Sequence, residues 1–174
     1  MITEGRILYH GTTYKFDKVD LSKARGFKDF GRGFYLATDF GQAEKWAKRA
    51  NAKYVYVYCY RIGNIEDKFL KTYELPKYNQ EWLDFIADNR INGKNPDYDI
   101  IYGKVADNKG EVLSTVIRDY SKGRIPAKEA LDKIRFRKDK FDQYCFRTEK
   151  AIRVLYREKI YVWKRNGRGE WDLV

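Results

Sequence analysis

The sequence predicts one α+β domain over residues 1–174, in which strands and helices alternate without a regular repeat. Three observations indicate this class. Runs rich in β-branched and aromatic residues alternate with segments whose apolar residues recur every three to four positions, as on one face of a helix. Clusters of glycine, proline and asparagine separate these segments. A length of 174 residues without a linker or low-complexity stretch indicates a single core.

The predicted strands are Ile7–Tyr9, Phe34–Ala37, Lys53–Arg61, Tyr98–Val105, Asp142–Phe146, Lys159–Lys164 and Glu170–Leu173. The tyrosines of the third strand alternate strictly with other residues, and we expect most of them to pack in the core or across strands. The last two strands flank Asn166-Gly167, which predicts a closing hairpin. Residues 11–32 are interpreted as a functional loop and residues 63–78 as irregular.

Helix signals fill most of the remaining chain. The predicted helices are one from the N-cap Asp39 to about Arg49, one from Asn79 or Gln80 to about Arg90, one from Gly110 to Gly123, one starting at Pro126, and a short one capped by Thr148 that includes Ala151, Ile152 and Leu155.

The chain is strongly basic, with 36 Lys and Arg against 25 Asp and Glu and a net charge of +11. Such a charge attracts polyanions such as nucleic acid, although a solvated basic surface gives the same count. The charge is densest at Lys133–Lys140 and Arg157–Arg168. Cys59 and Cys145 lie in apolar runs and are predicted to be buried thiols.

No Cys/His cluster is present, so no metal is expected. The sequence has no apolar signal region and no stretch of 18 apolar residues, so a cytoplasmic protein without a membrane partner is expected. A toxin that is delivered without a cleaved signal remains open.

Two glycine-containing motifs, Leu8-Tyr-His-Gly-Thr12 and Gly31-Arg-Gly-Phe-Tyr35, stand beside predicted strands. Glycine beside a strand end lets a ligand approach the main chain, so these motifs indicate a small-molecule site. His10 is the single histidine of the chain, which excludes enzymes that need a pair of histidines. The nucleophile motif of α/β-hydrolases, the Rossmann fingerprint and the phosphate-binding P-loop are all absent.

Together with Gln143-Tyr-Cys-Phe146, these motifs resemble those of ADP-ribosyltransferases of the His–Tyr–Glu type, the relatives of diphtheria toxin and the poly(ADP-ribose) polymerases. Ala43 and Trp46-Ala47 also fit that pattern. Asn89-Arg90, Tyr98–Gly103 and Val105-Ala-Asp107 look more like a bacterial subfamily of unknown function within the superfamily. The resemblance covers nearly the whole chain and implies a split, curved antiparallel sheet with surrounding helices, which binds NAD as co-substrate.

The resemblance also implies roles for single residues. The NAD-binding residues are expected to be His10, Gly11, Thr12, Gly33, Phe34 and Tyr35. His10 would bind the adenine-side ribose, and Gly11 would bind the nicotinamide amide through its backbone. Tyr35 would stack on the nicotinamide ring, and the loop of residues 13–30 would lie over the donor.

The expected catalytic residues are His10, Tyr35 and Gln143, but Gln143 stands where the family usually has glutamate. A carboxylate about 4 Å from the cationic ribose would contribute about 4 kcal/mol at an effective dielectric constant near 20. Glutamine can hold a ribose hydroxyl but supplies no charge. Three interpretations stay open: a slow enzyme, an acceptor that brings its own anion, or a protein that only binds. Glu149 is a poor substitute because it belongs to the following helix.

The functional prediction is a mono-ADP-ribosyltransferase, as a bacterial toxin or anti-phage effector, with an antitoxin as a further candidate partner. The basic charge favours nucleic acid over protein as acceptor, with Arg25, Lys28 and Arg32 as candidate contacts unless they belong to a solvated loop. One alternative is a non-catalytic module that binds NAD or nucleic acid. The other is a small basic ribonuclease toxin.

Overall fold

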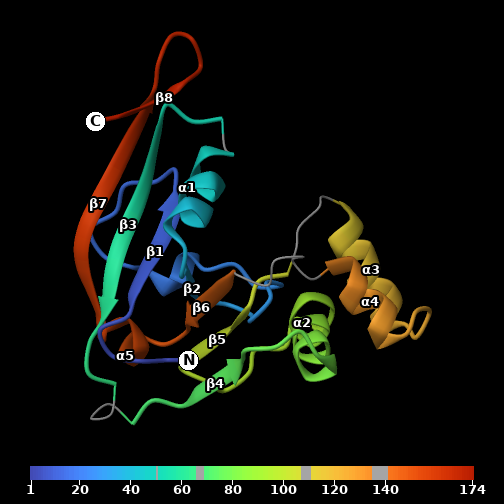
Figure 1. Ribbon diagram of the computed structural model, residues 1–174. Coiled ribbons are helices and arrows are strands. Elements are labelled where there is room, and N and C mark those ends of the chain that lie inside the picture. Colours follow the sequence, from blue (N-terminus) through green and yellow to red (C-terminus); the bar gives the residue numbers. More distant parts are fainter. Residues whose placement is uncertain (50, 66–68, 107–110, 135–140) are drawn as a thin grey trace.

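The computed structural model in Figure 1 describes residues 1–174 except 50, 66–68, 107–110 and 135–140. Its strands are β1 (Ile7–Thr12), β2 (Phe34–Ala37), β3 (Tyr54–Ile62), β4 (Thr72–Leu75), β5 (Ile100–Lys104), β6 (Asp142–Phe146), β7 (Leu155–Arg165) and β8 (Trp171–Leu173). Its helices are α1 (Phe40–Lys48), α2 (Gln80–Asn92), α3 (Glu111–Ser121), α4 (Ala127–Ile134), α5 (Glu149–Ile152) and the short 3-10 helix η1 (Leu21–Lys23). The predicted α+β class is confirmed. Gly110, Asp107 and residues 135–140 of the charged run lie outside the described residues.

The strands form one curved, open sheet in the order β4-β5-β6-β2-β1-β3-β7-β8. Neighbours are antiparallel except β4 and β5, which run parallel. Helix α2 connects these two strands, because a parallel pair needs a crossover that returns the chain to the same end of the sheet. The curved antiparallel sheet that the family resemblance implies therefore has one parallel pair at this edge. Residues 63–78, predicted to be irregular, contain β4, whose four residues are too few to show a clear alternation.

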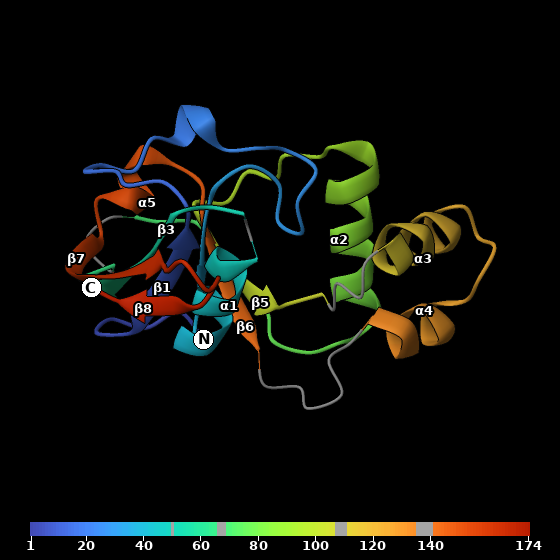
Figure 2. The ribbon, with the colours of Figure 1, turned by 90° about the horizontal axis from the view of Figure 1, so that it is seen from above.

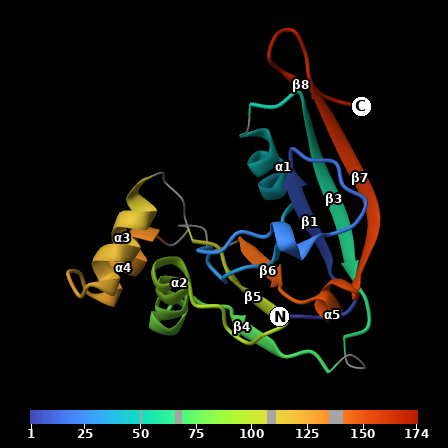
Figure 3. The same ribbon diagram turned by 180° about the vertical axis from the view of Figure 1, so that it is seen from behind.

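The sheet divides between β1 and β2. These strands share one registered pair, Tyr9 with Ala37, whereas β1 pairs with β3 along its whole length and β2 does the same with β6. Figures 1 and 3 show the long strands β3 and β7 on one side of this division and β6, β5 and β4 on the other. The end of β1 and the start of β2 are therefore not paired with each other. Both sequence motifs lie at this gap.

Helices cover the two parts of the sheet separately. Helix α1 packs on β1 and β3. Helices α2, α3 and α4 form a group beside β5 (Figure 2), and β4 lies next to β5 (Figure 1). The buried residues form a core on each face of the sheet, and Cys59 and Cys145 are buried free thiols as predicted. Tyr58 and Tyr60 of β3 are buried, which confirms the packing role expected for them. None of the described helices is both long and apolar enough to span a membrane.

Local signals fix the starts of two helices. Asp39 accepts a hydrogen bond from the N–H of Gln42 at 2.7 Å, and Thr148 accepts one from the N–H of Ala151 at 3.3 Å. Both residues are therefore the N-caps that the sequence predicts. The β7–β8 hairpin around Asn166 is also confirmed.

Two strands are longer than predicted. Strand β1 continues through Thr12, because all of its residues pair with β3. The residues His10–Thr12 are thus part of the strand rather than the start of a loop. Strand β7 begins at Leu155, which we expected inside the short helix α5. The pairing of Leu155 with Ile62 outweighs its helical spacing.

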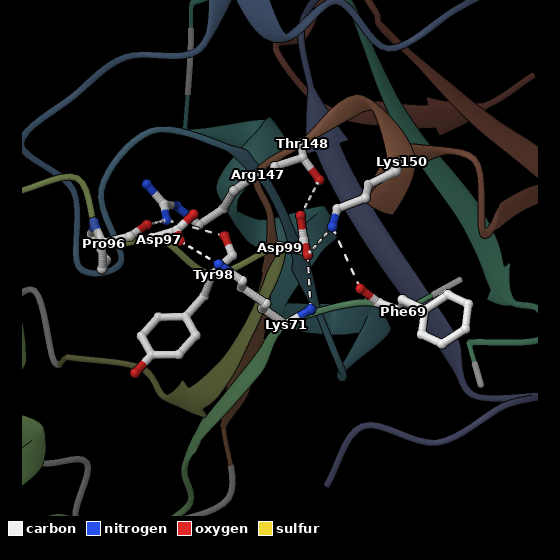
Figure 4. A network of polar contacts seen from close by, with 9 residues as sticks. All are labelled: Phe69, Lys71, Pro96, Asp97, Tyr98, Asp99, Arg147, Thr148 and Lys150. Atoms are coloured by element: carbon white, nitrogen blue, oxygen red, sulfur yellow. Dashed lines mark hydrogen bonds and ion pairs between the residues drawn. The ribbon is translucent and has the colours of Figure 1, made fainter. Parts of the chain in front are cut away.

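A buried carboxylate, that of Asp99, joins β5 to the segment that follows β6 (Figure 4). Asp99 accepts hydrogen bonds from the N–H of Lys71 and from the Thr148 hydroxyl, both at 2.7 Å, and its Oδ2 lies 2.8 Å from Lys150 Nζ. Beside it, the Arg147 guanidinium donates to the carbonyls of Pro96 and Tyr98. Burial alone would raise the pKa of Asp99, but the Lys150 ammonium, the Thr148 hydroxyl and the Lys71 N–H outweigh it and lower the pKa.

We expect Asp99→Ala to lower the free energy of unfolding by about 3 kcal/mol, because it removes three contacts to one buried carboxylate. Since the folded-state pKa is lowered, this contribution is present above the unfolded pKa of about 3.9 and is lost as pH falls through the folded value. Urea titrations between pH 3 and 7 measure both effects. Asp97→Ala is the control, because Asp97 is 91% exposed and its described partner is the exposed Lys71 ammonium. Equal losses in the two variants would contradict this account.

Candidate functional site

His10 lies in β1 directly after Tyr9, the residue of β1 that pairs with Ala37 of β2. Its Nδ1 is 2.8 Å from the carbonyl oxygen of Tyr35, so this side chain bridges the gap between the strands. A carbonyl oxygen only accepts, so Nδ1 carries the proton. Burial lowers the pKa of His10, which keeps the ring neutral at pH 7. Nε2 is therefore an unprotonated acceptor, and no residue in the described part of the chain donates to it.

Aromatic rings from β2 and the first loop cover His10. The ring centroids of Phe34 and Phe16 lie 4.4 Å and 5.9 Å from that of His10. Phe16 also stacks on Tyr58 of β3 at 4.1 Å, and its N–H donates to the Tyr58 hydroxyl at 2.6 Å. The contacts of Phe16 therefore hold the loop of residues 13–33 against the sheet above His10.

Tyr35 projects from the other face of β2, because neighbouring strand residues alternate and Phe34 is the residue that contacts His10. Its hydroxyl donates to the Gly31 carbonyl at 2.8 Å and accepts from the Phe30 N–H at 2.9 Å. The rings of Tyr35 and Phe30 are nearly parallel, with centroids 6.3 Å apart. Burial raises the pKa of Tyr35 well above its ordinary value, so the hydroxyl stays protonated and keeps its donor role.

Gln143 lies in β6, opposite Ala37 of β2 and Gly103 of β5, and is 4% exposed. Its Nε2 donates to Asp29 Oδ2 at 2.7 Å. The other carboxylate oxygen, Oδ1, accepts from Arg90 Nε at 2.6 Å. A buried carboxylate needs such partners to offset its lost hydration, and Asp29 has both a cation and an amide.

The structure brings Tyr35 and Gln143 to one face of the sheet. Cys145, two residues after Gln143 on β6, packs in the same core cluster as Tyr35. The loop contacts both side chains, because Asp29 accepts from Gln143 and the Gly31 carbonyl accepts from Tyr35. The His10 ring lies toward the other face and contacts Tyr35 through its main chain. No described hydrogen bond joins any two of the three side chains. The expected catalytic residues are therefore neighbours on adjacent strands, not one bonded group.

Gly11 and Gly33 of the two motifs allow neighbouring parts of the protein to pack closely against their backbone. A Cβ on Gly11 would lie 1.9 Å from the carbonyl oxygen of Ala43 in α1, and a Cβ on Gly33 would lie 2.4 Å from a side chain of β6. Close packing is thus a structural reason for both glycines, and the approach of a ligand to the main chain at these positions stays a prediction. Thr12 ends β1, and its hydroxyl accepts from the N–H of Tyr14 at 3.2 Å.

The three candidate acceptor contacts lie in the loop of residues 13–33. Arg25 and Lys28 are exposed and pair with no described carboxylate. Arg32 donates to the Ala24 carbonyl at 3.1 Å and lines a cavity of about 420 Å³ together with Arg147. The loop therefore carries positive charge that no described acidic side chain neutralises.

Asp29 was not among the predicted site residues, although it contacts Arg90, which is 61 positions later in the chain, and Gln143, which is 114 positions later. No local pattern marks such a residue. Arg90 belonged to the family resemblance, but nothing in the sequence connected it to Asp29. Among the described residues, no three His, Cys, Asp or Glu side chains gather as metal ligands.

The fold and the site define an α+β protein whose open mixed sheet holds a buried polar cluster beside its central gap. The chain belongs to the family described as a protein of unknown function (DUF3990), whose model matches residues 6–156. No curated protein and no solved structure is significantly similar to the chain.

Proposed function

We propose that the protein is an NAD-dependent mono-ADP-ribosyltransferase with an ADP-ribosyltransferase-like fold. One observation carries the proposal. His10 bridges the gap between β1 and β2 by its contact with the Tyr35 carbonyl, and Gln143 lies on β6, the strand next to β2. Residues from all three motifs of the family resemblance thus lie on three adjacent strands, at the point where the sheet divides.

The chemistry of the site supports these roles. The neutral His10 ring offers Nε2 as an acceptor for a ribose hydroxyl. In the proposed reaction the bond between ribose C1′ and the nicotinamide nitrogen breaks, and nicotinamide leaves with the electron pair. The acceptor then bonds to C1′ and loses a proton. Gln143 would accept a hydrogen bond from a ribose hydroxyl and hold the sugar in position.

NAD binding would also involve the loop. Phe30 lies beside one face of the Tyr35 ring, so nicotinamide would stack on the opposite face. We propose nucleic acid as the acceptor, because Arg25, Lys28 and Arg32 lie in the same loop without described carboxylate partners and the chain carries a net charge of +11.

We expect His10→Ala to reduce nicotinamide release from NAD by about 10²-fold, because NAD loses the contact that holds its adenine-side ribose and positions the donor. Because burial lowers the His10 pKa, any loss of release caused by protonation of this ring should begin at a lower pH than for an ordinary histidine, whose pKa is about 6.5. Chromatography of nicotinamide measures both effects, and thermal melts confirm that the variant is folded. Lys128→Ala, an exposed change on α4, is the control. Equal release by His10→Ala and the wild type would contradict the proposal.

A binding module without catalysis is the second candidate. The observation that favours it is the neutral amide of Gln143, whose nearest carboxylate, Asp29, is already paired with Arg90. This candidate predicts NAD binding by calorimetry with no release of nicotinamide.

A further inference from the structure

We propose that Asp29 is the positioning residue of the candidate site, which turns the Gln143 amide so that Oε1 rather than Nε2 is offered to a bound ligand. The inference rests on the proposed function. It also assigns a role to a residue that neither the motifs nor the family resemblance includes.

The geometry allows one orientation of the amide. Asp29 Oδ2 is an acceptor, so the Gln143 atom 2.7 Å away must be the donor Nε2. The reversed amide would place two oxygen acceptors at that distance inside a core where Gln143 is 4% exposed and Asp29 is 6% exposed. Oε1 therefore turns away from Asp29, and no described residue donates to it. A charged acceptor on Nε2 also polarises the amide, which makes Oε1 a stronger acceptor.

Arg90 holds the Asp29 carboxylate in the position from which it orients the Gln143 amide. Its Nε donates to Asp29 Oδ1 at 2.6 Å, so each oxygen of the carboxylate has its own donor. In Asp29→Asn the single remaining oxygen would stay with Arg90, because a guanidinium only donates. The new NH₂ group would then face Gln143 and force its amide to reverse. The variant would thus present Nε2, a donor, where the wild type presents an acceptor.

The same contact explains why glutamate is absent at position 143. A glutamate there would place two carboxylates in hydrogen-bonding contact in a buried site, where both cannot ionise. Gln143→Glu alone should therefore fail to improve the enzyme. The double variant Asp29→Asn with Gln143→Glu should restore the activity that Asp29→Asn loses. The asparagine amide introduced at position 29 would donate to one glutamate oxygen and leave the other oxygen as the acceptor for the ligand.

Steady-state nicotinamide release from NAD is the first test. We expect Asp29→Asn to lower kcat about 10²-fold with a smaller change in KM, and the double variant to regain most of that loss. Asp17→Asn is the matched control, because it makes the same change on an exposed residue of the same loop. Wild-type kcat in Asp29→Asn, or a single Gln143→Glu more active than the double variant, would overturn the inference.

Stability against pH is the second test, and it does not depend on activity. The glutamate of Gln143→Glu would have a raised pKa beside Asp29, so its destabilisation should grow from pH 5 to pH 8. Adding Asp29→Asn should remove this pH dependence. If the wild type released no nicotinamide, the proposed function would fail, while the stability results would still decide the Asp29–Gln143 pairing. A flat pH dependence in Gln143→Glu would overturn the pairing itself.

Discussion

Phe30→Ala is expected to lower the free energy of unfolding by about 3–5 kcal/mol, the range for deleting a buried aromatic ring. Phe30 belongs to the first long loop but is 0% exposed. Its ring packs near Tyr35 and Phe85, and it fits over Gly103, where a Cβ would lie 2.9 Å from Phe30 Cζ. The loop is therefore part of the core at this point, and the cavity left by alanine is costly. Urea denaturation measures the change.

Phe27→Ala is the matched control for Phe30→Ala. Phe27 lies three residues earlier in the same loop but is 64% exposed, and its ring contacts Gly93 at the end of α2. We expect a loss of at most about 1 kcal/mol for this variant. Similar losses for Phe27→Ala and Phe30→Ala would show that the loop is not anchored through Phe30.

Gly11→Ala is expected to destabilise the fold by about 3 kcal/mol, near the upper end of the overpacking range. The added Cβ would lie 1.9 Å from the carbonyl oxygen of Ala43 and 3.3 Å from the Cβ of Ala47. The nearer atom belongs to the backbone of α1, so the whole helix would have to move away from β1. Because β1 also carries His10, this shift would disturb the β1–β2 gap. Chemical denaturation measures the loss of stability.

Gly167→Ala is the control for Gly11→Ala, because a Cβ at Gly167 meets no atom within 4 Å. It should change stability by no more than about 0.5 kcal/mol. A stable Gly11→Ala variant that had lost only NAD binding would contradict close packing as the reason for this glycine. It would instead support the original interpretation that a ligand approaches the main chain there.

Features that depend on neighbouring residues could be predicted from the sequence. Strands β2 and β6 have the predicted bounds, and Asp39 and Thr148 cap the helices that follow them. A capping side chain reaches an N–H two or three residues ahead, so the signal is local. The hairpin at Asn166 is predictable for the same reason.

Features set by distant pairing could not be predicted in the same way. Strand β4 is four residues long and is defined by its parallel partner β5 across helix α2. The extra residues of β1 and β7 are strand because β3 lies between them and pairs with both. In each case the hydrogen bonds that make the strand come from residues far along the chain.

The candidate site also contains residues that the sequence indicated and residues that it did not. The sequence indicated His10, Tyr35 and Gln143, and the structure places them on adjacent strands. The loop residues that hold two of them, Asp29 for Gln143 and Phe30 for Tyr35, carry no periodic or motif signal. Their contacts exist only when the loop folds back onto β6 and α2.

Transfer of doubly labelled NAD tests the central claim most directly. The wild type would be incubated with NAD that carries one label on adenine and another on nicotinamide, in the presence of RNA, DNA or cell lysate. We predict that the adenine label becomes covalently attached to nucleic acid while the nicotinamide label is released in equal amount, and that both are about 10²-fold lower in His10→Ala. If NAD stays intact with every acceptor and calorimetry detects no NAD binding, the protein is not an ADP-ribosyltransferase.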